Sequence, residues 1–465
     1  MNLISFRGMP LRHDFRRCLV RFLAILAFFP LTTSFLSAQQ AAPAPPPADS
    51  AKNNPEFAAT ADEVLKDMSE ITGWKLKTPL KKTMRSREEI HAYVLKQMDD
   101  EKDAKERYAS TRSAEAFGLI PKGFDLENFL VELLTEQIAG LYDPKAHEFY
   151  IADWIAPEDQ RMVMSHELTH ALQDQQFQIE PWVKAARPND DAELARESVL
   201  EGSAMAGMLD YTLRDKGLKL RELPDIDPEM FVGDLSATPM LKKAPPFIKD
   251  SLMFPYFSGL TFSLSVLKAD GWNGFAAVFA RPPADTQQIM HPELYRAGKV
   301  APPIKLELPP DFPGQPWVLL EQNYMGEFGW KEILKQFLDE DRAKNLSVDW
   351  NGDIYATYEW KDAKRLLLVT RIRFSTPETA ERFFGQYSVA LQKKYVDRTN
   401  SFRRPDFFTF DTIGGGVFLR CSGSECVTLE GGDRAQYLQW MKSLGWEALS
   451  EPEKKPVGAQ TKTFR

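Results

Sequence analysis

The chain has 465 residues, of which 43% are hydrophobic and 27% are charged, and its formal net charge at pH 7 is −8. This acidic balance argues against a nucleic acid or an anionic lipid surface as the main partner. The composition is that of an ordinary soluble protein, and a chain with roughly 400 folded residues can form two or three domains with substantial cores.

The N-terminus, residues 1–38, has the pattern of a signal peptide. Several arginines precede an apolar stretch at 22–29, and this stretch is shorter than the roughly 18–20 residues that span a membrane. Ser37 and Ala38 offer small residues for cleavage. We therefore expect an exported protein, periplasmic or secreted, with an uncleaved anchor as the alternative. Residues 39–54 are rich in Ala and Pro, which predicts an extended linker.

The segment after the linker is predicted to be mainly helical from Pro55 to Leu119. Apolar residues recur at helical spacing over Phe57–Ile71 and from Ser86 to about Met98. A further helix is expected over Leu126–Leu141. Glu148–Asp153 alternates between polar and apolar residues, which predicts a short strand leading almost directly into the next helix.

That next helix carries the motif that points to chemistry. Residues 166–170 read HELTH, and a helix start is expected at Pro157. His166 and His170 are two of only six histidines, and an i, i+4 pair projects from one helix face, so that both imidazoles can bind one metal ion. Glu167 is turned by about 100° around the axis, where it can contact a metal-bound water. Two ordinary histidines are the alternative interpretation.

A catalytic zinc needs a third protein ligand, and a second helix offers one. We predict that this helix begins with Asp190 as N-cap and Glu193 closing a capping box, and that it ends near Lys216. Glu197 and Glu201 share one face with apolar residues, where a carboxylate is costly unless it meets a cation. We choose Glu201 as the ligand. Glu197 remains the alternative, as does a pair of solvated acids.

These motifs together resemble a known family. HELTHALQDQ, followed by a helix with the sequence LEGSA at 200–204, resembles the gluzincin branch of zinc metallopeptidases. More narrowly, the chain resembles exported bacterial proteins of mostly uncharacterised function, which share HELTHALQDQ, the sequence GLYDP at 140–144 and a later tract from Phe254 to Glu293. The resemblance spans about Phe117 to Tyr295.

The resemblance implies a zincin-like fold with one zinc ion per chain. It makes His166, His170 and Glu201 the ligands and Glu167 the general base. The spacing between His170 and Glu201 is longer than in the best-known gluzincins, so the choice between Glu201 and Glu197 stays open at this point. By the same resemblance, the strand over 148–153 borders the cleft and pairs with the substrate backbone; a strand without substrate contact is the alternative.

Downstream of the second helix, residues 223–247 are rich in Pro and Asp and are predicted to form a long loop, a type of segment that often serves as a lid. A helix is expected over Phe254–Leu267. His291, Tyr256 or Tyr295 could donate a hydrogen bond to an oxyanion opposite the metal. For His291, which lies in a Pro-rich turn, a structural role is the alternative.

The character of the chain changes near Asp341, and a small α+β domain is predicted over 341–449, with the tail 450–465 disordered. Its expected order is ββαββα, with a turn at Trp350–Asp353 and the following elements: strands 354–359 and 366–374, a helix from Ser375 to Tyr395, strands 417–420 and 427–430, and a helix over 435–444. Cys421 and Cys426 flank a four-residue turn, so they could form a disulfide across this hairpin, with a zinc knuckle as the alternative.

The sequence therefore predicts an α+β protein. A largely helical, zincin-like metallopeptidase domain with a short edge strand covers 55–340, and the small α+β domain follows. The predicted function is that of an exported zinc metallopeptidase that cleaves a peptide or protein substrate through a metal-activated water, with Glu167 as base. The alternatives are an exported binding or scaffolding protein with a structural or vestigial zinc site, and a zinc amidase acting on cell-wall material.

Overall fold

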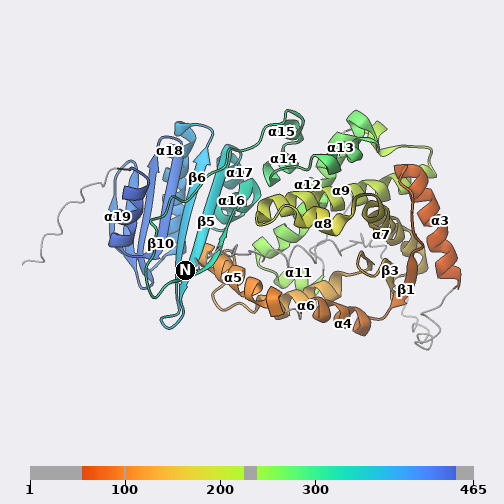
Figure 1. Ribbon diagram of the computed structural model, residues 1–465, viewed down its shortest axis with the longest axis horizontal. Coiled ribbons are helices and arrows are strands. Elements are labelled where there is room, and N and C mark those ends of the chain that lie inside the picture. Colours follow the sequence, from red (N-terminus) through yellow and green to blue (C-terminus); the bar gives the residue numbers. More distant parts are fainter. Residues whose placement is uncertain (1–54, 99–100, 225–237, 447–465) are drawn as a thin grey trace, which may run out of the picture.

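The structure is a computed structural model, and it describes residues 55–98, 101–224 and 238–446. The predicted signal peptide, linker and C-terminal tail lie outside these ranges, as do residues 225–237 of the predicted lid. In the described ranges, no helix is both long and apolar enough to cross a membrane. The fold is α+β, as predicted, with a helical domain beside a β-rich C-terminal domain (Figure 1).

The helical domain contains a small sheet and a long series of helices. Its elements are α3 (Pro55–Thr72), β1 (Lys81–Arg85), α4 (Arg87–Met98), α5 (Glu101–Phe117), α6 (Leu126–Gln137), β2 (Gly140–Asp143), β3 (Glu148–Ala152), α7 (Pro157–Phe177), α8 (Ile179–Lys184), α9 (Asp190–Arg214), η1 (Leu220–Glu222), α11 (Pro239–Lys243), α12 (Pro246–Asp270), α13 (Gly274–Ala280), α14 (Thr286–Met290) and α15 (Pro292–Arg296). The helix expected over 254–267 thus begins earlier, and α11 and the first turn of α12 occupy part of the predicted loop.

The small sheet corrects the prediction of an edge strand. Its order is β1-β3-β2, in which β3 pairs in parallel with β1 and antiparallel with β2. Both sides of β3 are therefore occupied, so the strand predicted over 148–153 exists but cannot pair with a substrate backbone as proposed. The edge strand next to α7 is β2, whose first two residues were predicted as the end of a helix. The α6 helix ends at Gln137 because Ile138 is already extended.

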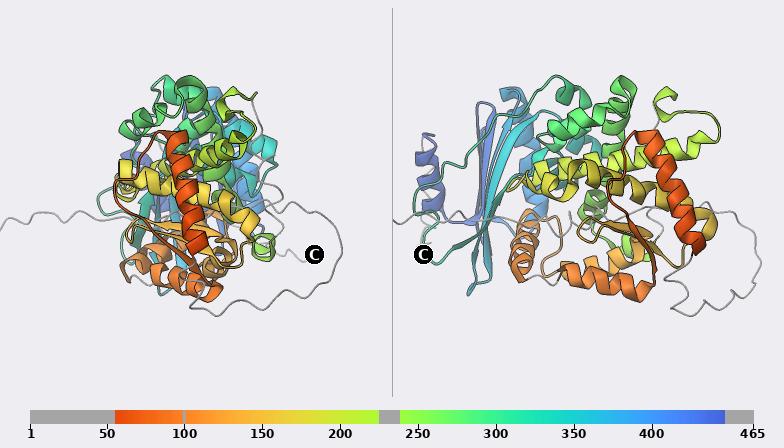
Figure 2. Two further views of the ribbon diagram at one scale, coloured as in Figure 1. Left: turned by 90° about the vertical axis from the view of Figure 1, so that its right-hand side faces the viewer. Right: turned by 45° about the vertical axis from the view of Figure 1, so that its right-hand side comes forward.

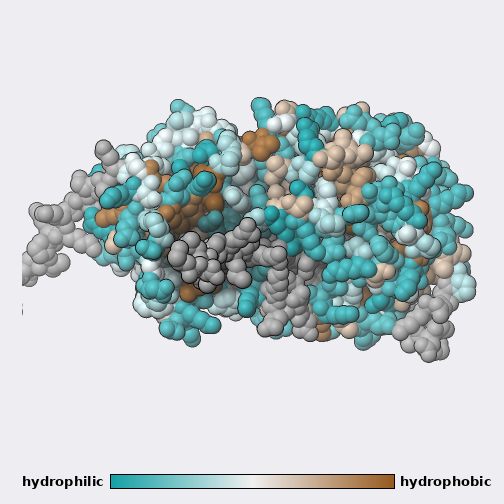
Figure 3. All heavy atoms as spheres, in the orientation of Figure 1, coloured by the Kyte–Doolittle hydropathy of each residue, from teal (hydrophilic) through white to brown (hydrophobic). Residues whose placement is uncertain are grey.

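The centre of the helical domain is the packing of α7, α9 and α12. At the crossing of α9 and α12, a Cβ placed on Gly202 would lie 2.6 Å from the Cα of Gly259 and still closer to its carbonyl group. Only glycine permits this approach of the two backbones. On the face shown in Figure 3, the surface of this domain is largely hydrophilic, whereas Leu168, Val199 and Leu260 are fully buried.

The C-terminal domain is built on a seven-stranded antiparallel sheet of order β4-β5-β6-β10-β9-β8-β7. Its elements are β4 (Val318–Asn323), α16 (Gly326–Lys335), α17 (Glu340–Ser347), β5 (Trp350–Trp360), β6 (Arg365–Phe374), α18 (Pro377–Lys394), β7 (Thr399–Arg403), β8 (Phe407–Thr412), β9 (Gly415–Ser422), β10 (Glu425–Gly432) and α19 (Arg434–Ser443). α19 packs on one face of the sheet, and α18 packs on the face toward the helical domain (Figure 2).

Several details of this domain differ from the sequence-based expectations. The sheet begins with β4, N-terminal to the boundary predicted at 341, and β7 and β8 were not predicted. Residues 350–353 belong to β5, where the pairing with β6 shifts register, and do not form a turn. The disulfide between Cys421 and Cys426 is confirmed, and the two residues face each other in the β9–β10 hairpin.

Helix α5 joins the two domains. The Tyr108 hydroxyl donates to Glu359 on β5 at 2.7 Å, and the Ser113 hydroxyl bonds to Thr357 at 2.9 Å. Phe117, at the end of α5, is buried in the core of the C-terminal domain. A segment predicted to belong to the first domain therefore packs on the sheet of the second.

Candidate metal centre

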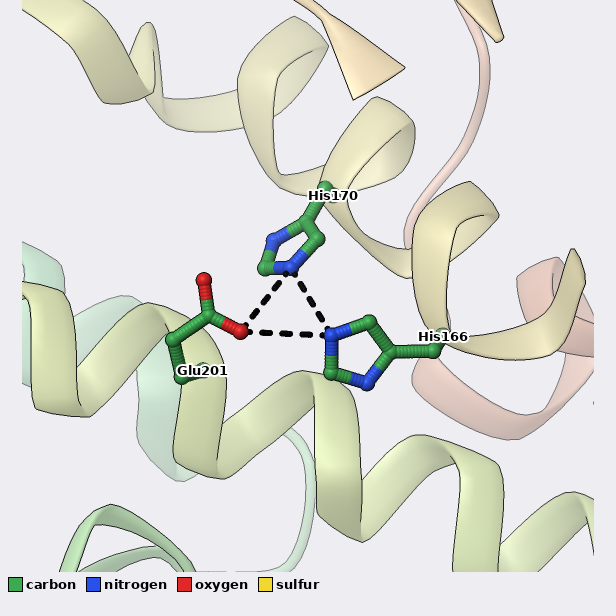
Figure 4. A group of neighbouring side chains, drawn as sticks. All are labelled: His166, His170 and Glu201. Carbon is green, nitrogen blue, oxygen red and sulfur yellow. Dashed lines mark hydrogen bonds and ion pairs between the residues drawn. The ribbon is translucent and has the colours of Figure 1, made fainter. Parts of the chain in front are cut away.

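The structure brings together the three residues that were predicted as metal ligands. His166 and His170 lie on α7 and Glu201 lies on α9, and their side chains point toward one another (Figure 4). The two histidine Nε2 atoms are 3.2 Å apart, and the Glu201 Oε2 atom lies 3.2 Å from the Nε2 of His166 and 3.4 Å from that of His170. Within the described part of the chain, this is the one group found whose geometry could hold a metal ion.

The geometry of these donors fits a tetrahedral ion. With bonds of about 2.0–2.1 Å from zinc to nitrogen or oxygen, adjacent ligands of a tetrahedron are about 3.3–3.4 Å apart. All three side chains are buried, with at most 3% exposed, and Oε1 of Glu201 has no hydrogen-bond partner. A buried carboxylate is costly unless a cation compensates it, so these residues could hold a metal ion.

A glutamine orients the second histidine. The Nδ1 of His170 bonds to the Gln173 side-chain oxygen at 2.8 Å, which leaves Nε2 free to bind a metal. The Gln173 amide then donates to the Ser203 hydroxyl at 2.8 Å and to the Leu200 carbonyl at 3.2 Å, both on α9. Gln173 was not among the residues predicted from the sequence to belong to the site. Its position three residues after His170, on the same helix face, is the signal that could have identified it.

The electrostatics of the three predicted ligands favour a positive charge among them. Burial opposes the charged form of His170, but the adjacent Glu201 carboxylate raises the pKa of this histidine to about 9. Burial alone would raise the pKa of Glu201; His170 and His166 instead lower it. A proton on His170 thus occupies the role that a metal cation would take, so proton and metal compete for these ligands.

Glu167 has the environment expected of a general base. The backbone N–H of Tyr142 on β2 donates to its Oε2 at 2.9 Å, whereas Oε1 is buried and has no hydrogen-bond partner. Burial raises the pKa of Glu167 to about 8, and a bound cation would lower it. One oxygen is therefore fixed and the other is available for a proton.

Glu197, the alternative ligand, lies one helical turn before Glu201 and is not part of the donor group. It is buried, and its Oε2 has no hydrogen-bond partner. Burial, with the nearby carboxylates of Glu193 and Glu201, raises its pKa well above the ordinary value. Because its carboxylate lies outside the donor group, the geometry favours Glu201 as the ligand.

Among the predicted oxyanion donors, Tyr256 is the one beside a predicted metal ligand. Its ring stacks on that of His166, with 6.2 Å between the centroids. His291 instead bonds to Glu327 at 2.8 Å, and the Tyr295 hydroxyl donates to the Arg281 carbonyl at 2.8 Å.

The start of α9 differs by one residue from the prediction. Asn189, not Asp190, is the N-cap, and its side chain accepts from the Ala192 N–H at 3.0 Å. The predicted capping box does not form, because with Asn189 as N-cap the N3 position is Ala192, and the Asp190 N–H donates to the Asn323 side chain at 3.1 Å.

Comparisons with known proteins give few matches. Residues 318–439 match a domain of unknown function (DUF8575), and this range begins where β4 begins. No curated protein matches the chain. A crystal structure from Chloroflexus aurantiacus, described as "a putative hydrolase with a novel fold", is 15% identical over 62% of this chain and 98% of that chain, with a TM-score of 0.33. We draw no conclusion about fold or activity from a similarity this low.

Proposed function

We propose that the protein is an exported zinc metallopeptidase of the gluzincin kind. The observation that carries this proposal is the buried group of His166, His170 and Glu201 beside a glutamate with one unpartnered oxygen. Two imidazoles and one carboxylate are a donor set of catalytic zinc sites. The same set also occurs in iron oxygenases, but the base position of Glu167 in HExxH favours zinc hydrolysis. Export rests on the signal-peptide pattern of residues 1–38.

When bound, zinc would polarise the substrate carbonyl and increase the acidity of water. The chain itself supplies the proton transfer. Glu167, held at Oε2 by the Tyr142 N–H, would accept a proton from the attacking water at Oε1 and pass it to the leaving amine. We retain Tyr256, which is next to His166, as the candidate donor to the oxyanion.

The predicted alternative of a scaffold with a structural zinc site is less well supported. A structural site has no use for a buried carboxylate whose free oxygen is unpaired, and leaving such an oxygen without a partner costs about 1–3 kcal/mol. Oε1 of Glu167 has no such partner, as we expect if this oxygen accepts a proton from the attacking water.

The test is hydrolysis of a quenched-fluorescence library of mixed-sequence peptides by the purified protein. Glu167→Gln keeps the size of the side chain and removes its basicity. We expect this variant to keep its zinc and to lose about 100-fold to 10,000-fold in rate, the usual contribution of a general base. His170→Ala should lose the metal. Hydrolysis by Glu167→Gln at the wild-type rate would contradict the proposal.

A further inference from the structure

One residue of strand β2, Tyr142, makes two hydrogen bonds to helix α7. The backbone N–H of Tyr142 donates to Glu167 Oε2 at 2.9 Å, and the Tyr142 hydroxyl donates to Asp174 Oδ2 at 2.8 Å. Glu167 and Asp174 are separated by seven residues on α7, about two helical turns, so they lie on the same face of the helix. Tyr142 therefore spans this face from the proposed base to the C-terminal part of α7.

The backbone of β2 is also unusually close to the helix at this place. A Cβ on Gly140 would lie 2.5 Å from the Val163 Cγ1 and 3.0 Å from the Glu167 Cγ. Glycine therefore lets the strand rest directly against the base-bearing turn of α7. The sequence GLYDP was noted as part of a family resemblance, and this packing gives its glycine and tyrosine physical roles.

Burial makes both contacts of Tyr142 specific. Tyr142 is 3% exposed and Asp174 is 8% exposed, and hydrogen bonds in such surroundings are costly to lose. The hydroxyl lies 3.2 Å from the His147 Nδ1 as well, and the other oxygen of Asp174 accepts from the Ile179 N–H at 3.3 Å. The acceptor of the Tyr142 hydroxyl is thus itself fixed.

We propose that Tyr142 is a positioning residue for the general base. The hydrogen bond from its hydroxyl to Asp174 fixes β2 against α7. The Tyr142 N–H then holds Oε2 of Glu167, so that Oε1 keeps one orientation. This inference rests on the proposed function for its catalytic consequence. The attachment of β2 to α7 can be tested without any activity.

The decisive variant is Tyr142→Phe, which removes only the hydroxyl. Its matched control is Tyr150→Phe on the neighbouring β3, where the hydroxyl bonds to Glu148 of the same strand at 3.0 Å. With the mixed-sequence peptide library as substrate, Tyr142→Phe should lower the apparent kcat by about tenfold to 100-fold, since a displacement of a catalytic group by about 1 Å can cost about 100-fold. KM should stay within about twofold and the zinc content should not change. The control Tyr150→Phe should match the wild type in kcat, KM and zinc content.

Asp174 tests the same contact from the helix side and serves if Tyr142→Phe fails to fold. Asp174→Ala removes the acceptor and should reduce kcat in the same way. Asp174→Asn keeps one of the two acceptor oxygens, so it should reduce kcat less than Asp174→Ala does. The double variant Tyr142→Phe/Asp174→Ala should be no slower than the worse single variant, because both changes remove one interaction.

Hydrogen exchange separates this inference from the proposed function. The residue 142 amide should exchange faster in Tyr142→Phe than in the wild type and in Tyr150→Phe. If the wild type has no zinc-dependent hydrolysis, the proposed function fails, and the exchange result alone decides whether the attachment exists. Equal kcat and equal amide exchange in Tyr142→Phe and Tyr150→Phe would overturn the inference, as would a loss of zinc in Tyr142→Phe.

Discussion

Because α9 and α12 cross closely at Gly202, adding one methyl group at this position should strongly destabilise the protein. Gly202 follows the proposed ligand Glu201, and it contacts the Gly259 backbone. In Gly202→Ala, the new Cβ would meet three backbone atoms of Gly259, of which Cα is at 2.6 Å and the carbonyl atoms are closer. Carbon atoms in contact are normally about 3.5–4.0 Å apart, and the Gly259 carbonyl carbon would lie only 2.0 Å from the new Cβ, so the helices must separate by about 1.5 Å.

The cost can be estimated from overpacking in well-packed cores, which typically destabilises a protein by about 1–3 kcal/mol. The obstacle here is backbone, which cannot rotate away, so we expect a loss near the upper end, about 3 kcal/mol in the free energy of unfolding. The assay is urea denaturation followed by tryptophan fluorescence and by circular dichroism, because agreement of the two probes tests two-state behaviour.

Gly385 provides the matched control. It lies inside α18, and a Cβ there would have no atom within 4 Å. Gly385→Ala should therefore stabilise the protein by about 0.5–1 kcal/mol, the usual gain from replacing a helical glycine that has no steric role. A Gly202→Ala protein as stable as the wild type, or as stable as Gly385→Ala, would refute the close crossing.

Two further predictions concern pH and the disulfide. The hydrogen bond with buried Glu327 raises the pKa of His291 above its ordinary value, so the stability that this pair contributes is complete below about pH 6.5 and is lost as the pH rises through the folded-state pKa. The difference in free energy of unfolding between wild type and His291→Gln should therefore shrink from about pH 6 to about pH 9 in urea titrations; a difference that grows would contradict this. Replacing both Cys421 and Cys426 by alanine should lower the free energy of unfolding by about 2 kcal/mol, the loop-closure entropy for a separation of five residues. An unchanged urea midpoint would show that the crosslink contributes no stability.

Local periodic signals in the sequence were enough to predict much of the helical framework. The HELTH helix, the Glu201 helix and α18 lie where apolar spacing and capping residues place them. The histidine pair is a local feature of one helix, so its geometry follows from helical pitch alone. The disulfide was equally local, since its two cysteines belong to one hairpin.

The errors concern partners that are distant in the sequence. β1 is a short, mostly polar segment, and it becomes a strand because it pairs with β3, more than sixty residues later. β2 continues an apolar run of helical character, and its pairing with β3 overrides that pattern. Without knowledge of these two pairings, β3 could not be recognised as the central strand.

The domain boundary and the contacts of Tyr142 with α7 could not be predicted for the same reason. α5 has a polar sequence typical of a solvated helix, but its hydroxyls bond to β5 across the domain junction. The contact between Tyr142 and Glu167 depends on a strand docking on a helix, which no spacing within the HExxH segment can reveal. Glu201 could not be separated from Glu197 because both share one helix face, and only the position of α7 distinguishes them.

The proposed function requires that His166, His170 and Glu201 hold one zinc ion. The most direct measurement is the metal content, by mass spectrometry, of the purified wild type and of two matched variants. We expect about one zinc per chain in the wild type and in Glu197→Ala, and none in Glu201→Ala, with all three proteins folded. A folded, metal-replete wild type without zinc, or a Glu201→Ala variant that keeps its zinc, would contradict it.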